Sequence, residues 1–437
     1  MAWKLWPSSK KNKQDLEKRG ISLLERVIKS TPAVLIGIVL TFFLSRSGIF
    51  RQLETYALDT QVRLQGADHD SDVVVVRIDD QDYDNLFHSK SPLDQATLLK
   101  IINAIAAGKP RVIGVDIDTT SIQFREMHPP TNGPVIVWAR NGSFSHRDGK
   151  YHLSALLGGQ EPDPTFGVIV MRLDADGAIR RYPQLCATSQ GAVPSFPWAV
   201  MKAFEPETAN RRQPTQDDLF IKFAGDREGS HRQHFTASRI LELADGPGWR
   251  ADSPIKDKVV LLGGAYAADD EHDTPLGWML GVEVLAYAVE TELKGGGLRP
   301  ASPILVTVLG GFSGLVLLLL FQHFTPPKAL LLSLMAIPVL GMISSLFTFK
   351  TMAFWAYFVP IPLAVLAQEF YHQAKDYRKK LIQQLYEGVV GKPVEAAAAP
   401  KDKPEDAPAI DEPTALPAET KDKIKPDPTP VALSPPP

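Results

Sequence analysis

The chain has 437 residues, one cysteine and a formal charge of -3, from 47 Lys and Arg against 50 Asp and Glu. This near balance gives no overall basic surface, so we predict no nucleic-acid partner. A lone cysteine cannot form a disulfide within the chain, and no neighbouring His or Asn makes Cys186 a recognisable nucleophile. We therefore interpret Cys186 as a small, buried apolar residue.

Four apolar runs divide the sequence, one near the N-terminus and three between residues 304 and 367. A bilayer core of roughly 30 Å needs about 20 apolar residues in a helix. No small-x-small cleavage site follows the first run, so we interpret it as an anchor rather than a signal peptide. The predicted transmembrane helices are residues 30–48, 303–324, 329–349 and 351–370.

Basic residues predict the orientation of these spans. They gather in residues 1–29 and again just after the last run, which places both termini in the cytoplasm. Residues 49–302 then form a periplasmic or extracellular domain. This arrangement describes a multi-pass protein of the bacterial inner (cytoplasmic) membrane.

Two different segments follow the last run. Residues 371–390 have a helical composition, and Phe370, Ala374, Tyr377 and Leu381 form a short coiled-coil-like stripe. This juxtamembrane helix either pairs with a second copy or a partner, or lies against lipid headgroups. Residues 391–437 are rich in proline and poor in large apolar side chains, which predicts a disordered cytoplasmic tail.

Strands and helices alternate along the external segment. A β-branched run at 73–78, a helical pattern at 93–107 and a second apolar run at 112–117 predict a β-α-β unit. We expect further strands at 135–139, 168–173, 178–183, 219–223 and 259–263, and helices at 196–204, 237–243 and 282–293. An Asp-Gly step joins the strands at 168–173 and 178–183 as a hairpin. The predicted fold class is an α/β extracytoplasmic domain, with a mostly parallel sheet and one antiparallel hairpin, plus four transmembrane α-helices.

Polar residues and glycines end three of these strands. Open α/β sheets bind ligands at the carboxyl ends of their strands, so neighbouring ends would bring several carboxylates together. Such a cluster could hold a divalent cation, with Asp79 and Asp116 as metal candidates, or a cationic ligand. In the alternative interpretation these residues cap helices and turns. The residues in question are Asp79, Asp80, Asp116, Asp118, Gly263 and Gly264.

A second acidic group surrounds His272. Asp270, Asp273 and Thr274 complete the candidate ligand-binding set, but no second half of a zinc site is visible. The pair His231 and His234 lacks Cys or Glu companions nearby in sequence, and we interpret both histidines as solvated surface residues. No P-loop, kinase motif or G-x-S-x-G elbow is present, which favours a protein that is not an enzyme.

Several motifs together resemble one family. The opening QLETYALDTQVRLQG contains Glu54, Asp59 and Arg63, and DGAIRRYP contains Arg180. The closing KDKVVLLGG segment leads to a Thr274-Pro275 turn, Gly281 and Glu283. These motifs resemble the type-two CHASE domains, extracellular sensory modules associated with bacterial cyclases and histidine kinases. The resemblance covers residues 53–366.

The sequence departs from that family at positions near the expected ligand crevice. Only Pro92 is kept of the segment before the first helix, and Leu285 replaces the usual histidine of the last helix. No output domain follows. The ligand therefore cannot be carried over from the resemblance, and any extracytoplasmic ligand is unknown.

Three functions remain open. The leading hypothesis is a sensor that signals through its C-terminal transmembrane helices to a separate cytoplasmic or membrane signalling protein, with homodimerisation possible. The alternative is a structural membrane scaffold that binds another protein through its periplasmic domain. The third is an extracytoplasmic enzyme using Asp79, Asp116 and Asp270 on a metal. We expect no cofactor other than a divalent cation.

Overall fold

The computed structural model describes residues 51–64, 71–160, 164–225, 231–266, 270–300 and 377–386, with a few isolated positions elsewhere. The chain divides into two units, residues 1–376 and 377–437. In the second unit, residues 377–386 are helical with exposed side chains. The predicted tail at 391–437 lies outside the described residues.

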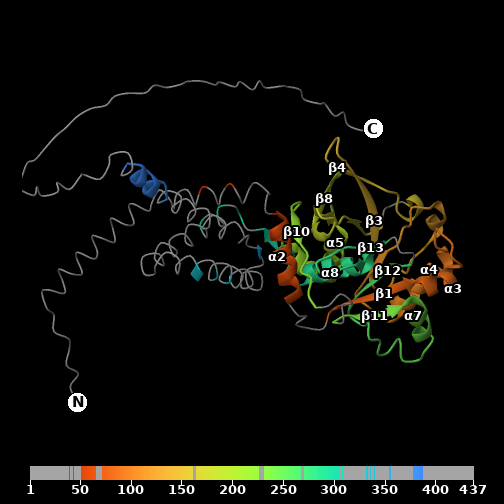
Figure 1. Ribbon diagram of the computed structural model, residues 1–437. Coiled ribbons are helices and arrows are strands. Elements are labelled where there is room, and N and C mark those ends of the chain that lie inside the picture. Colours follow the sequence, from red (N-terminus) through yellow and green to blue (C-terminus); the bar gives the residue numbers. More distant parts are fainter. Residues whose placement is uncertain are drawn as a thin grey trace, which may run out of the picture. The chain divides into compact units, whose positions relative to one another are not determined.

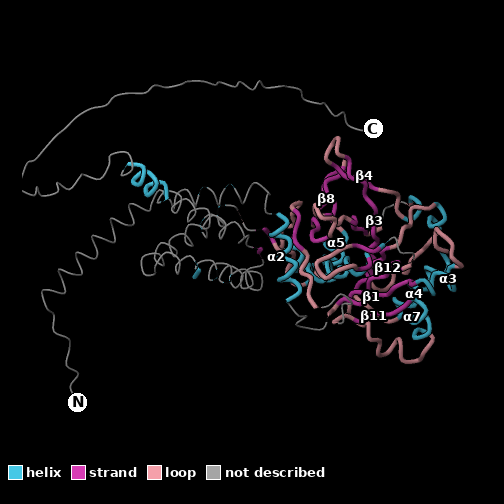
Figure 2. Tube along the Cα trace, viewed as in Figure 1, coloured by secondary structure: helices cyan, strands magenta, loops and turns pink. Residues whose placement is uncertain are grey.

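Six parallel strands form the centre of the first unit, in the spatial order β11-β1-β12-β2-β3-β5. Figure 2 draws the strands in magenta and labels β11, β1, β12 and β3 of this sheet. Their apolar side chains are buried on both faces of the sheet, which explains the continuous β-branched runs in the sequence. The strands are β1 (Val73–Asp79), β2 (Val112–Asp116), β3 (Val135–Ser145), β5 (Phe166–Ile169), β11 (Gln233–Thr236) and β12 (Val259–Ala265).

Helices cover both faces of this sheet (Figure 1). Alternate residues of one strand serve the two faces: Val74 and Val76 pack in one cluster, and Val73 and Val75 in the other. The domain is therefore a three-layer α/β/α structure. The first face carries α3 (Asp80–Phe87), α4 (Gln95–Ala107) and α7 (Ala237–Ala244), and the second carries α5 (Phe196–Phe204) and α8 (Gly281–Leu293).

Antiparallel strands extend this core. The end of β3 pairs with β4 (Lys150–Leu153), and β8 (Leu185–Thr188) and β9 (Gly191–Pro194) continue that edge. A separate three-stranded sheet has the order β10-β7-β6, and β13 pairs with β14 in a short ribbon. The remaining elements are η1 (Ile122–Glu126), η2 (Leu157–Gly159), β6 (Arg172–Leu173), β7 (Ile179–Pro183), α6 (Pro206–Arg211), β10 (Asp218–Phe220), β13 (Glu271–His272), β14 (Met279–Leu280), β15 (Arg299–Pro300) and β16 (Phe354–Trp355).

The helix α2 (Arg51–Leu64) packs on the outer side of α8. Its Leu58 and Val62 share a buried cluster with Tyr287 of α8 and with Leu298, close to the point where the chain leaves the domain. The entrance and the exit of the domain therefore share one apolar core.

The prediction of a single antiparallel hairpin is wrong. The predicted pair exists as β6 and β7, but β3–β4, β8–β9, β7–β10 and β13–β14 are antiparallel as well. The single strand expected at 168–173 is two strands, because the chain leaves the central sheet after Ile169 and joins the second sheet at Arg172. Periodicity missed β11, since its sequence QHFT is short and polar.

The four transmembrane helices of the predicted fold class are also corrected. Among the residues that the structure describes, no helix is long and apolar enough to cross a bilayer. The four ranges lie mostly outside the described residues, and Phe354 and Trp355, inside the last one, form a short strand paired with β15.

Candidate functional site

The carboxyl edge of the parallel sheet contains a topological switch point. The strand β12 lies between β1 and β2, with Gly263 opposite Asp116 and Ala265 opposite Asp79. After β1 the chain enters α3 on one face, whereas after β12 it continues into α8 on the other. Neighbouring strands whose connections leave to opposite faces open a crevice between them, where ligands of such sheets usually bind.

Two carboxylates meet in this crevice near the beginning of α8. A Cβ added to Gly281 would lie 2.6 Å from both carboxylate oxygens of Asp270, so this carboxylate packs directly against the first residue of the helix. The side chain of the N-cap residue makes no capping hydrogen bond to α8. The positive end of the helix dipole therefore favours an anion at this position. His272 Nε2 lies 3.3 Å from Asp270 Oδ1.

Asp116 faces this pair from the end of β2. Burial, together with the negative charge of Asp270, raises the pKa of Asp116 to about 7, although His272 acts in the opposite direction. A carboxyl with such a pKa changes its charge near neutral pH. Displaced pKa values of this kind are typical of functional sites.

Two tyrosines form an aromatic wall beside the carboxylates. The rings of Tyr83 and Tyr266 stack with centroids 4.2 Å apart and an interplanar angle of 6°. Tyr266 also covers Gly264, where an added Cβ would lie 3.0 Å from its ring. Burial and then the neighbouring Tyr83 and Asp270 raise the pKa of Tyr266, so its hydroxyl remains protonated near neutral pH.

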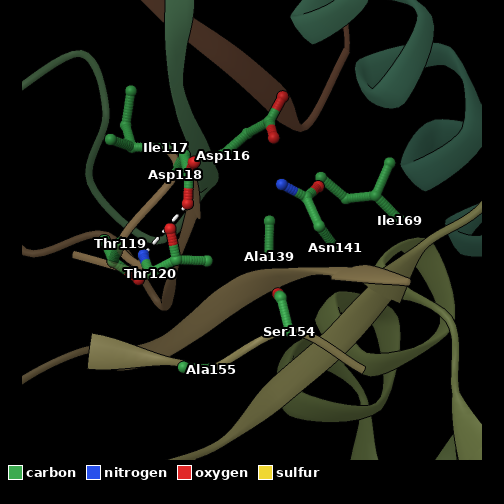
Figure 3. A pocket seen from close by; sticks show the side chains of 10 residues that line it. All are labelled: Asp116, Ile117, Asp118, Thr119, Thr120, Ala139, Asn141, Ser154, Ala155 and Ile169. Atoms are coloured by element: carbon green, nitrogen blue, oxygen red, sulfur yellow. Dashed lines mark hydrogen bonds between the residues drawn. The ribbon is translucent and has the colours of Figure 1, made fainter. Parts of the chain in front are cut away.

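A polar cavity of about 50 Å³ opens beside Asp116. Figure 3 shows the side chains of Asp118, Thr120 and Asn141 around it, with Ser154 near its base. The Ser154 hydroxyl oxygen is buried, and no hydrogen-bond partner for it lies among the described residues. A cavity this small holds a water molecule or an ion but no metabolite, since small-molecule pockets usually exceed about 300 Å³.

The other predicted residues have structural contacts. Asp79 Oδ1 accepts from the Asp82 backbone N–H at 2.8 Å and caps α3, and Asp80 lies exposed in the first turn of that helix. The main-chain oxygen of Asp273 accepts from Ile179 N at 2.8 Å, and the Thr274 hydroxyl donates to Gly277 O at 2.6 Å. Asp116 and Asp118 therefore line one cavity and the charge of Asp270 acts on Asp116, while Asp79 serves as a cap.

The metal hypothesis for Asp79 and Asp116 gains no support from the geometry. Within the described parts of the chain, no group of three or more His, Cys, Asp or Glu side chains lies close enough to hold a metal ion. Asp118 Oδ1 is partly engaged, since it accepts from Thr120 N at 3.0 Å. A cation at this edge would need the neutral oxygens of the cavity as well.

The residues that carried the family resemblance connect α2 to the domain. Asp59 forms a bidentate ion pair with the buried Arg180, with both N–O distances 2.8 Å. Arg63 Nε donates to Pro275 O at 2.8 Å. Glu54 lies in the first turn of α2, and its side chain is outside the described residues.

The interpretation of His231 and His234 as solvated surface residues is wrong. The His231 side chain is only 5% exposed and contacts Glu290 at 3.0 Å, and His234 contacts Glu283 at 3.1 Å. Between them, Arg232 contacts both glutamates and lies 3.8 Å above the Tyr287 ring centroid. The seven-residue spacing of the two glutamates, which places them on one face of α8, was the available signal.

The charges in this network are strongly coupled. Burial opposes ionisation of Glu290, but hydrogen bonds from His231 and Lys294 and the charge of Arg232 outweigh it and lower the pKa of Glu290 to about 2. Glu292 has a similar environment, with Tyr182 OH at 2.5 Å, Gln184 Nε2 at 2.8 Å and Arg212 at 2.5 Å. Sequence reasoning missed these residues, since their partners are far apart along the chain.

Cys186 is buried against Tyr151, Val168 and Val170, as predicted. Burial raises the pKa of its thiol to about 12. The thiolate, which is the nucleophilic form, is therefore scarce near neutral pH.

Comparison with known families gives one match. A model of the CHASE2 domain matches residues 34–322, which confirms the resemblance predicted from the sequence motifs. No curated protein and no solved structure matches the chain.

Proposed function

The chain belongs to the CHASE2 domain family, a family of extracellular sensory domains, and on this premise we propose that it is the input module of a sensor. The module binds a small cation in the carboxyl-edge crevice and passes its state to a separate signalling partner. One observation carries the choice of site: Asp116, whose pKa is raised to about 7, borders a polar cavity in which the Ser154 hydroxyl has no partner among the described residues.

The chemistry of the crevice favours a cation. The cavity lining supplies two carboxylates together with hydroxyl and amide oxygens, which are the ligands that hard cations and ammonium groups prefer. A bound cation would favour the ionised form of Asp116. Binding then releases a proton, and below pH 7 the affinity falls by up to about tenfold per pH unit.

We propose further that the domain binds without catalysis. The Ser154 hydroxyl makes no hydrogen bond to a base among the described residues, and the Cys186 thiol is buried with a raised pKa. A hydroxyl that is not hydrogen-bonded to a base and a thiol that stays protonated both argue against covalent chemistry at these residues.

Differential scanning fluorimetry of the full-length protein tests the proposal. The probes are Mg²⁺, Ca²⁺, K⁺ and ammonium, added singly at pH 8 after treatment with a chelator. A ligand that binds only the native state at 100 times its Kd stabilises it by about 2.7 kcal/mol. We expect one probe to raise Tm in the wild type and to have little effect on Asp116→Asn.

The matched control is Glu242→Gln, which removes an exposed carboxylate paired with Arg239 on α7. The cation-dependent Tm shift of this control should equal that of the wild type. Nonspecific screening of charges by the cation would instead shift the wild type and both variants alike. Equal shifts in all three proteins, or none with any probe, would overturn the cation site. The small cavity would then favour the scaffold, and capture of a protein partner would be the next experiment.

A further inference from the structure

We infer that residues 270–281, called here the crevice ribbon, couple the carboxyl-edge crevice mechanically to helix α2. This inference rests on the proposed sensor function and assigns the route by which a change in the crevice reaches α2. The ribbon consists of β13, a turn and β14, with Glu271 opposite Leu280 and His272 opposite Met279.

The base of the crevice ribbon lies in the crevice. Its first residue, Asp270, packs on its last residue, Gly281, with no space for a Cβ between them. His272 contacts Asp270 at 3.3 Å, and the charge of Asp270 acts on Asp116. A displacement of Asp270, or the loss of its charge, therefore acts directly on Gly281, the residue that closes the ribbon against α8.

The tip of the crevice ribbon lies against α2. Pro275 O accepts from Arg63 of α2 at 2.8 Å, and Asp273 O accepts from Ile179 of β7 at 2.8 Å. Leu276, in the turn of the ribbon, packs against the same apolar cluster as Leu58 and Val62 of α2. The tip therefore cannot shift without disturbing the surface on which α2 rests.

A second contact makes α2 sensitive to such a shift. Arg180 is only 4% exposed and holds Asp59 of α2, while its neighbour Ile179 bonds to the ribbon tip. Tip, β7 and α2 thus form one closed set of contacts. Because the set contains a few directional hydrogen bonds and a packed core, it transmits small displacements rather than absorbing them.

Hydrogen exchange of the full-length protein, without any ligand, tests this coupling. Two variants disturb the ribbon base in different ways: Asp270→Asn removes its charge, and Gly281→Ala adds a Cβ that would collide with the Asp270 carboxylate. We expect amide exchange in α2 to become at least about fivefold faster in both, the lower end of typical coupling factors. Exchange in α4, on the opposite face of the sheet, should stay unchanged.

Asp79→Asn is the matched control. It alters a carboxylate at the same edge of the sheet but outside the ribbon, and asparagine retains the helix cap. Its α2 exchange should match the wild type. Coupling is also reciprocal, so Arg63→Gln, which removes the α2 contact to the ribbon tip, should change the NMR shifts of the His272 ring at the base.

Unchanged α2 exchange in both base variants would overturn the inference, and so would an unchanged His272 signal in Arg63→Gln. Faster exchange throughout the domain would also contradict it, because that result means general destabilisation. A cation-dependent Tm shift remains possible in each of these cases. Failure of the ribbon coupling is thus distinguishable from failure of the cation site.

Discussion

Carboxylates on and around helix α8 lie in two contrasting environments. Glu283 in its first turn, and Glu290 and Glu292 near its end, are buried and each contacts an arginine. Near its N-terminus, the charge of Asp270 acts on the buried Asp116, and His272 contacts Asp270 at 3.3 Å. Compensated carboxylates hold elements together, whereas an uncompensated pair has a charge state that a proton or a cation can change. The comparison therefore separates the scaffold of this domain from its candidate receptor.

Removing Arg232 should have the largest effect. In Arg232→Met two buried glutamates lose their shared cation, and we expect the free energy of unfolding to fall by about 3–5 kcal/mol. Urea denaturation measures this change. The control Arg239→Met breaks an exposed pair with Glu242 and should cost less than about 1 kcal/mol. Equal effects in the two variants would show that burial does not distinguish these ion pairs.

Asp116→Asn should raise the free energy of unfolding, in contrast to Arg232→Met. The folded pKa of Asp116 lies above its ordinary value of 3.8, so its contribution to stability is complete below pH 4 and is lost as pH rises to about 7. Asparagine does not ionise, so the variant avoids this loss of stability. We expect the variant to gain on the wild type between pH 4 and 7, by about 4 kcal/mol once the pH is above 7. Urea titrations at pH 4.5, 6 and 8 test this, and a constant difference would contradict the raised pKa.

Substitution of Asp79 should have the smallest effect on stability. The sequence left open whether this residue is a helix cap or a ligand. If Asp79 only caps α3, then Asp79→Ala costs about 1 kcal/mol and Asp79→Asn costs almost nothing. Thermal unfolding of both variants provides the measurement. A loss of the cation-dependent Tm shift in Asp79→Asn would instead make this residue a ligand.

Strand and helix positions could be predicted well where the sequence is strongly periodic. The apolar runs at β1, β2 and β12 predict buried parallel strands, and α4 and α8 occur where helical spacing indicated them. The prediction was weakest where tertiary contacts replace local preference. The strand β11 is polar because one of its faces meets the glutamates of α8, an environment that its own four residues do not reveal.

The candidate site shows the same division. Aspartates after strands can be read from the chain, but their roles cannot. Asp79 and Asp116 occupy similar places in sequence, yet one caps a helix through Asp82 N and the other faces a second carboxylate. Which of the two happens depends on the residue that the fold places opposite.

The sequence by itself determined the α/β alternation, the carboxyl-edge acids and the family resemblance, because periodicity and short motifs are local properties. Only the tertiary structure decided that the charge of Asp270 acts on Asp116, that His231 and His234 contact the glutamates of α8, and that Arg180 holds Asp59. Each of these contacts joins residues from different elements. Their energies depend on burial and on the distance between charges, which exist only once the chain has folded.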